Sequence, residues 1–219
     1  MNKYMGFYEL KNINMPTVPW REFDAGTKLD PGLLWTVRTA VESGGDMSLP
    51  RAVGATAAEA EEKGGQFLKN YADIGLVIYY PYFIAEKSGV LDITGERTVV
   101  EAVDKDLWNL VTDGKRDVTV IVPKDSPVMQ DASLITSLVN EVSADCGDYR
   151  ISFEGNRSFL GGDELSELLK YASVIRGRFR EEISEGRSVV AEWSYAYNTD
   201  INHEPVGSRY IVFYELRSI

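Results

Sequence analysis

Alternation of hydrophobic and polar residues marks the end of the chain as two strands. Residues 189–197 form the first, with one face carrying Glu192, Ser194 and Ala196. Residues 209–217 form the second, and strict alternation places on one face Ile211, Phe213, Glu215 and Arg217. A hairpin that turns over residues 198–208 sets Glu192 opposite or diagonal to Glu215, with their side-chain stems about 4.5–8 Å apart.

Helical periodicity predicts three helices. Thr56 and Glu59 form a capping box ahead of the segment 57–75, which Gly64 and Gly65 weaken. Asp131 can cap a second helix, whose shared apolar face consists of Leu134, Ile135, Leu138, Val139 and Val142. Asp163 can cap a longer third helix, whose apolar face consists of Leu165, Leu168, Leu169, Ala172, Ile175, Phe179 and Ile183.

The remaining periodic segments are rich in β-forming residues. Strands are predicted over residues 4–10, 76–86, 89–94, 98–103, 118–123 and 148–155, with residues 87–89 joining the second to the third. Residues 33–41 are an apolar run that carries Arg38, and Gly44-Gly45 closes it. Because strands and helices follow in mixed order, the sequence predicts an α+β fold with a mixed or antiparallel sheet, flanking helices and a C-terminal β-hairpin.

Composition narrows the function classes. The chain has 219 residues, 44% of them hydrophobic, and a formal net charge of −11. This is the composition of a globular protein long enough to bury a core. The acidic balance argues against non-specific binding to nucleic acid or to an anionic membrane, and leaves open a nucleotide held by local arginines or Mg²⁺.

Single cysteine and histidine residues exclude several kinds of site. Cys146 alone cannot form an internal disulfide or a cysteine-based zinc cluster, and we expect it to pack as a small apolar residue. His203 alone cannot form a multi-histidine metal site, and its neighbours indicate an exposed turn without a chemical role. The longest apolar run, residues 75–85, is too short to span a membrane, and residues 1–10 lack the apolar core of a signal peptide, so we expect a cytoplasmic protein.

The predicted hairpin is the main candidate for chemistry. It places two carboxylates, Glu192 and Glu215, beside the guanidinium of Arg217. Such like charges are costly to hold together unless a cation lies between them. The alternative is that one of the glutamates simply points to water. No P-loop, dinucleotide-binding, HExxH or GxSxG motif is present in the sequence.

Four segments, in order between residues 35 and 219, resemble the ATP-binding domain of the phosphoenolpyruvate synthase and pyruvate phosphate dikinase family. They are WTVRTA, FIAEKSGVLDI, TVVEAVDKDLWNLVTDGKRDVTVIV and the terminal VVAEWSYAYN…SRYIVFYELRSI. The last is similar to that family's Asp-Ile-Glu-Trp strand followed by an apolar strand that ends Gln-x-Arg-Pro-Ile. The resemblance implies an ATP-grasp fold, in which two lobes close over ATP and Mg²⁺.

The resemblance also implies roles for individual residues. Arg38 takes the place of an arginine on the ATP phosphates, and Glu101 matches the glutamate of a Glu-Ala pair. Glu192 matches a metal-binding glutamate, and Glu215 stands where the family has a metal-contacting glutamine. Arg217 takes the place of a phosphate-binding arginine. The implied metal ligands are therefore Glu192 and Glu215, and the implied cofactors are ATP and Mg²⁺.

The implied organisation is one ATP-grasp-like domain over residues 1–219, with a reduced first lobe over about 1–75 and a main lobe over about 76–219. The implied activity is phosphoryl transfer to a separate acceptor, either another protein chain or a small molecule. The chain departs from the family at Val190, at Glu215 and in the segment DLWNL, and only 37 residues precede Arg38. These departures favour an alternative: a degenerate, non-catalytic ATP-grasp-like domain that acts as a structural or regulatory partner protein.

Two further segments carry separate hypotheses. Residues 77–83, VIYYPYF, could present an aromatic surface to a partner or a ligand, or could form a buried pair of strands. The loop at residues 43–55 could be fixed or could act as a flap that closes Arg51 onto phosphates.

Overall fold

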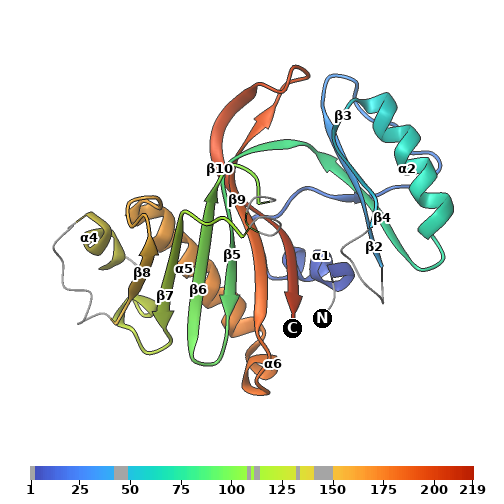
Figure 1. Ribbon diagram of the computed structural model, residues 1–219. Coiled ribbons are helices and arrows are strands. Elements are labelled where there is room, and N and C mark those ends of the chain that lie inside the picture. Colours follow the sequence, from blue (N-terminus) through green and yellow to red (C-terminus); the bar gives the residue numbers. More distant parts are fainter. Residues whose placement is uncertain (1–2, 42–48, 108–109, 111–113, 132–133, 141–149) are drawn as a thin grey trace.

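The computed structural model describes residues 3–41, 49–107, 110, 114–131, 134–140 and 150–219, and it has an α+β fold with two antiparallel sheets (Figure 1). The smaller sheet has, in order, β1 (Arg21–Glu22), β4 (Gly75–Pro81), β2 (Trp35–Val41) and β3 (Arg51–Ala55). The larger sheet has, in order, β10 (Pro205–Ser218), β9 (Val189–Thr199), β5 (Phe83–Ile93), β6 (Arg97–Asp104), β7 (Val118–Pro123) and β8 (Ser152–Gly155). The predicted α+β class is confirmed.

The helix at the smaller sheet forms where its capping box predicted. Helix α2 (Ala57–Tyr71) begins after Thr56, whose hydroxyl accepts a hydrogen bond from the Glu59 N–H while the Glu59 carboxylate accepts one from the Thr56 N–H. Its buried side packs against β2 and β4 through an apolar cluster that includes Ala60, Phe67, Val37 and Val77. The helix therefore covers one face of the smaller sheet (Figure 1).

The third predicted helix is divided in two. Helix α5 (Gly162–Arg178) ends at Arg178, because Phe179 leaves the helical conformation, and α6 (Arg180–Ser184) follows. The predicted cap at Asp163 is wrong, because Gly161 occupies the cap position and the Glu164 carboxylate accepts its N–H. Helix α4 (Leu134–Asn140) and a 3₁₀ turn, η1 (Pro127–Met129), precede it. The apolar faces predicted for α4 and α5 do contribute to the core.

The strand predicted over residues 4–10 is wrong, because this segment lies inside helix α1 (Lys3–Asn12). Phe7 and Leu10 are both fully buried and are spaced three residues apart, as one face of a helix requires. Gly6 faces the backbone of β10, where a Cβ atom would lie 1.9 Å from the carbonyl oxygen of Leu216. Helix α1 can therefore approach β10 this closely only because residue 6 is glycine.

The predicted junction at residues 87–89 is also wrong, since strand β5 runs through it. The strand requires glycine at position 89, because a Cβ there would be 2.4 Å from the indole ring of Trp193 and 2.1 Å from the carbonyl oxygen of Glu101. The true junction is Tyr82, between β4 and β5, where the chain passes from the smaller sheet to the larger. The predicted lobe boundary near residue 75 lies at the start of β4.

The terminal hairpin is tighter than predicted. Strand β9 continues to Thr199 and β10 begins at Pro205, so the turn spans residues 200–204 rather than 198–208. Asp200 organises it, because its carboxylate accepts the N–H groups of Asn202 and Glu204. His203 lies in this turn and is exposed, with its ring against Tyr82.

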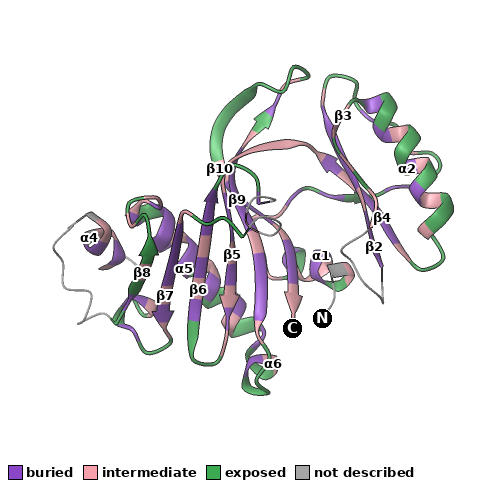
Figure 2. Cartoon of the chain, viewed as in Figure 1, coloured by how far each residue is buried: buried purple, intermediate pink, exposed green. Residues whose placement is uncertain are grey.

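The two faces of the larger sheet differ. One face is covered by α4, α5 and α6, and its side chains form the main apolar core, including Leu91, Val100, Val120, Ala191 and Trp193. The residues of the other face alternate with these core residues along each strand, and those of the central strands remain partly exposed to solvent (Figure 2). We call this second surface the open face; its central residues are Val90, Asp92, Val99, Glu101, Ile121 and Glu192.

Helix α1 joins the two sheets (Figure 1). A second apolar cluster contains Phe7 from α1, Ile78 and Tyr80 from the smaller sheet, and Ala196 and Val212 from the larger. In addition, Val18 donates its N–H to the carbonyl oxygen of Phe213, so the segment after α1 pairs with β10. The position of strand β2 relative to the terminal hairpin depends on this packing.

A buried charge network fixes helix α5 to the hairpin. The Glu164 carboxylate accepts a hydrogen bond of 2.8 Å from Lys87 on β5 and one of 2.7 Å from Arg209 on β10. Burial by itself would raise the pKa of Glu164, but the bonds from Lys87 and the Gly161 N–H lower it below its usual value. Because both carboxylate oxygens of Glu164 accept hydrogen bonds from these partners, we assign this residue a structural role.

Some predictions lie outside the described residues, namely those for Gly44-Gly45, Val142 and Cys146. Among the helices that are described, none has the length and apolar character needed to cross a membrane.

We predict that Gly6→Ala destabilises the protein by about 1–3 kcal/mol, because the new methyl group overlaps the Leu216 carbonyl and α1 must move off β10. The matched control is Gly65→Ala in α2, where a Cβ meets nothing within 4 Å and the change should add about 0.5–1 kcal/mol of stability. Denaturant unfolding of both variants measures the difference. Equal effects of the two changes would contradict the packing of α1.

Candidate functional site

A bulge in strand β10 brings two glutamates face to face. Phe213 pairs with Trp193, but the register shifts after Phe213, so that Glu215 pairs with Glu192. The predicted opposition of Glu192 and Glu215 is confirmed. The prediction that Phe213 and Glu215 share a face is wrong, because the bulge at Tyr214 leaves Phe213 in the core and turns Glu215 to the open face.

Arg38 reaches this pair from the other sheet. Its guanidinium Nη2 lies 3.4 Å from Glu215 Oε2, a contact across 177 positions of the chain. Only 15% of the Arg38 side chain and 3% of the Glu215 side chain are exposed. Burial opposes the charge on Arg38, but Tyr80, Glu215 and Glu192 outweigh it and raise the pKa of Arg38 above its usual value. Arg38 therefore remains a cation beside two carboxylates.

Arg217 is the second cation of the group. Its Nη1 lies 3.8 Å from Glu215 Oε1, beyond hydrogen-bond distance but close enough for charge attraction. Arg217 sits two residues after Glu215 and pairs with Val190, so it lies on the open face. The structure thus brings together four of the five predicted site residues, Arg38, Glu192, Glu215 and Arg217.

Glu101 lies on the same face but farther along it. The register carries one row of residues across the open face, and its members from β10 to β7 are Glu215, Glu192, Val90, Glu101 and Thr119. Glu101 is two strands from Glu192, or roughly 10 Å at the usual strand spacing. It forms an ion pair with Arg116. The structure therefore places Glu101 beside the group rather than within it.

Three buried polar atoms on the open face have no hydrogen-bond partner among the described residues. They are Asp92 Oδ1, Thr119 Oγ1 and Arg217 Nε. Arg217 and Asp92 both pair with Val190, from opposite sides, and Thr119 pairs with Glu101. An orphaned polar atom in a protein interior costs about 1–3 kcal/mol, so three on one surface favour a polar ligand there.

A polar cluster borders the glutamates on their other side. The hydroxyls of Ser88 and Ser194 are 2.8 Å apart and buried, and the Ser194 hydroxyl donates to the Tyr214 oxygen at 3.3 Å. Burial, reinforced by the charge of Glu192, raises the pKa of Tyr214 well above its usual value. Tyr214 therefore stays neutral, and its hydroxyl donates a hydrogen bond of 3.4 Å to the carbonyl oxygen of Trp193.

The donor set fits Mg²⁺ only together with phosphate. Mg²⁺ is usually held by one or two carboxylates plus phosphate oxygens and water. Glu192 and Glu215 provide two carboxylates, and within the described ranges no group of three or more His, Cys, Asp or Glu residues could hold a metal ion. The chain's own residues thus suit a metal–nucleotide complex better than a metal ion alone.

Sequence reasoning missed Asp92, Thr119 and Tyr214. Asp92 and Thr119 carried a weak signal, since each is a polar residue between two apolar, buried neighbours in a strand. Tyr214 carried none, because its position follows from the bulge. Each of these residues gains its importance from neighbours on other strands.

The two other sequence hypotheses concern nearby segments. Most of residues 77–83 lie in strands β4 and β5, with Ile78 and Tyr80 buried, as the buried-strand alternative predicted. The predicted flap over residues 43–55 lies partly outside the described residues. Arg51, within this segment at the start of β3, pairs directly with Arg38 on β2 and has an exposed side chain.

We predict that the Arg38–Glu215 pair has a coupling free energy of about 1.5–3 kcal/mol in a double-mutant cycle of Arg38→Met and Glu215→Gln. Removing one partner leaves the other charge buried, whereas removing both does not. The control cycle uses Arg187→Gln and Glu185→Gln, a pair only 2.6 Å apart but at least half exposed, for which about 0.2–1 kcal/mol is expected. Denaturant unfolding measures both; equal couplings would refute the buried pair.

Comparison with known proteins adds little to this site. No protein-family model and no curated protein sequence matches the chain. One similar solved structure is the macrocyclase MdnC bound with precursor peptide MdnA from Microcystis aeruginosa MRC, at 10% identity and a TM-score of 0.37. That alignment covers 98% of this chain and 50% of the other, so this chain spans half the length of MdnC. A likeness at this level carries no inference about function.

Proposed function

We propose that this chain binds ATP together with Mg²⁺ on the open face, between strand β2 and the terminal hairpin, in an ATP-grasp-like fold. The observation that carries the proposal is the meeting of Arg38 from the smaller sheet with Glu192, Glu215 and Arg217 from the larger. These are the residues for which the resemblance to the phosphoenolpyruvate synthase family implies phosphate and metal contacts.

The residue types suit a triphosphate. Arginine guanidinium groups form paired hydrogen bonds with phosphate oxygens, and two arginines flank the carboxylates here. Phosphate-bound Mg²⁺ would supply charge neutralisation, with Glu192 and Glu215 as its protein ligands. On binding, the two arginines would exchange their contacts with carboxylates for contacts with phosphate oxygens, and the two glutamates would exchange theirs for contacts with the metal.

The orphaned polar atoms support the same location. Asp92 Oδ1, Thr119 Oγ1 and Arg217 Nε are buried along the open face and lack partners among the described residues. A nucleotide offers both phosphate and hydroxyl groups, so it can accept from the guanidinium and donate to the carboxylate. An apolar ligand would leave these atoms unsatisfied.

The activity that we propose is phosphoryl transfer to a separate acceptor. This reaction depends mainly on charge neutralisation and in-line positioning. Arg38 and Arg217 would hold the phosphates, and Glu192 and Glu215 would fix the metal.

The second candidate function is a non-catalytic domain that acts as a structural or regulatory partner. The specific observation that favours it is the direct contact between Arg38 and Glu215. Because this pair bridges the two sheets by itself, the same residues could stabilise the fold without any ligand. Nucleotide binding decides between the two functions.

We predict that ATP with Mg²⁺ raises the melting temperature of the protein by several degrees. A ligand at about 100 times its dissociation constant adds roughly 2.7 kcal/mol to a folded state that alone binds it. Mg²⁺ alone should give no shift, since two glutamates without phosphate are a poor magnesium site. Thermal unfolding with ATP, Mg²⁺ and both together measures this.

The variants Glu192→Ala and Arg217→Gln should lose the shift, while Arg187→Gln, an exposed arginine paired with Glu185, should keep it. Unchanged melting of the folded wild type in millimolar ATP and Mg²⁺ would refute nucleotide binding and favour the partner-protein function. A shift that survives in both site variants would place the nucleotide elsewhere.

A further inference from the structure

The carboxylate of Asp92 lies on the open face, on strand β5, without a charged partner. Its Oδ1 atom is buried and has no hydrogen-bond partner, and Asp92 forms no ion pair with any other described residue. The residue as a whole is only partly buried, so a ligand can reach the carboxylate from the open face. Because a partly buried charge is costly without a partner, this position favours a ligand of opposite charge.

The neighbours of Asp92 on the open face are apolar. The register places Val99 of β6 on one side of it and Val190 of β9 on the other, and Val90 lies two residues earlier in β5 on the same face. Val90 and Val99 are partly exposed, whereas Val190 is buried. A carboxylate between valines suits a ligand that joins a charged group to an aliphatic body.

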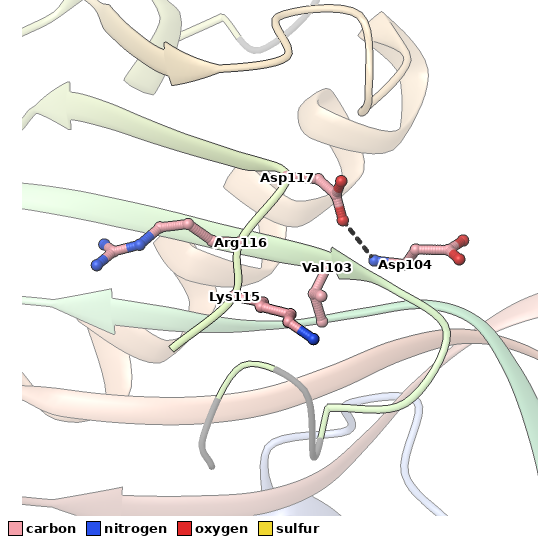
Figure 3. A pocket seen from close by; sticks show the side chains of 5 residues that line it. All are labelled: Val103, Asp104, Lys115, Arg116 and Asp117. Atoms are coloured by element: carbon pink, nitrogen blue, oxygen red, sulfur yellow. Dashed lines mark hydrogen bonds between the residues drawn. The ribbon is translucent and has the colours of Figure 1, made fainter. Parts of the chain in front are cut away.

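The charged groups at the nearby end of the sheet already have partners, in contrast to Asp92. A pocket where β6 ends and β7 begins is lined by Val103, Asp104, Lys115, Arg116 and Asp117 (Figure 3). The Asp117 carboxylate accepts the Asp104 N–H at 2.8 Å, and the Arg116 side chain extends away from both aspartates to pair with Glu101. The unbalanced charge of this surface is therefore at Asp92, not in the pocket.

Two further carboxylates raise the negative potential around Asp92. Asp92 lies two residues after Val90, which pairs with Glu101 on one side and with Glu192 on the other, so both glutamates are diagonal neighbours of Asp92. Diagonal neighbours on adjacent strands are about 7–8 Å apart. A nucleotide hydroxyl would satisfy one oxygen of Asp92 but would leave its charge unbalanced. A cationic group does both.

We propose that Asp92 binds the ammonium group of a small second ligand, a primary amine with an aliphatic body. The carboxylate accepts a charge-assisted hydrogen bond from the ammonium group, and Val90 and Val99 contact the methylene groups. The binding of the amine depends on Asp92 and its neighbours alone, and it does not require the nucleotide.

The role of this ligand as phosphoryl acceptor rests on the proposed function. An acceptor must also carry a hydroxyl group, so the class is an amino alcohol. With its ammonium group on Asp92, a short amino alcohol directs its hydroxyl toward Glu192, the proposed metal ligand about 7–8 Å away. The alcohol oxygen then forms a bond to the γ-phosphorus while the bond from that phosphorus to the bridging oxygen breaks, ADP leaves, and the hydroxyl proton passes to water.

The test is an NMR titration of the full chain, without nucleotide, using propanolamine in one series and propanediol in the other. The two compounds have the same length, and only the first is charged. We expect saturable shifts of the backbone amides of Asp92 and Val99 with millimolar propanolamine, and much smaller shifts with propanediol. Asp92→Asn should bind the amine roughly tenfold more weakly, because a neutral amide replaces the charged acceptor.

Asp125→Asn is the matched control, since it makes the same chemical change in an exposed ion pair with Arg150, in the turn after β7. It should titrate as the wild type does. The proposal is overturned if propanolamine causes no shift, if propanediol causes equal shifts, or if Asp92→Asn titrates like the wild type. Amine binding in a protein that ATP and Mg²⁺ do not stabilise would keep the Asp92 site and remove only its role in phosphoryl transfer.

Discussion

The candidate site depends on one irregularity, the bulge at Tyr214 in strand β10. The residues on either side of it, Phe213 and Leu216, both belong to the main apolar core, although strict alternation would send them to opposite faces. The bulge absorbs the extra residue and turns Glu215 to the open face, directly opposite Glu192. Without it, the core face would have to bury a carboxylate without a charged partner, which is strongly unfavourable. The contacts of Glu215 with Arg38 and Arg217 follow from this single shift of register.

The second requirement is that the two sheets keep their relative position. Arg38 belongs to the smaller sheet, and Glu215 belongs to the larger, so their contact forms only if α1 and the apolar cluster around Phe7 hold the sheets together. Gly6 allows α1 to approach the backbone of β10 closely. The same packing that stabilises the fold therefore sets the geometry of the charged group, and the open face beside it carries the orphaned polar atoms of Asp92 and Thr119.

Sequence alone predicted the elements whose signals are local. The capping box at Thr56 fixed the start of α2, and alternation identified β6, β7 and β9. It failed for α1, where clustered aromatic residues suggested a strand although contacts with β10 favour a helix. The pairing of Glu192 with Glu215 was predicted despite a turn that was too long, because two register shifts in β10 restore it. Asp92 and Thr119 could not be recognised, since their lack of partners depends on side chains from other strands.

The most direct test of the account is a crystal structure of the protein with Mg²⁺ and a non-hydrolysable ATP analogue. The account predicts the triphosphate on the open face between Arg38 and Arg217, with the metal ion on Glu192 and Glu215 and the Arg38–Glu215 contact lengthened or replaced by contacts to phosphate. An analogue bound elsewhere, or a site at saturating analogue concentration that retains the Arg38–Glu215 pair without nucleotide, would contradict it. In that case the charged group would be a structural link between the two sheets.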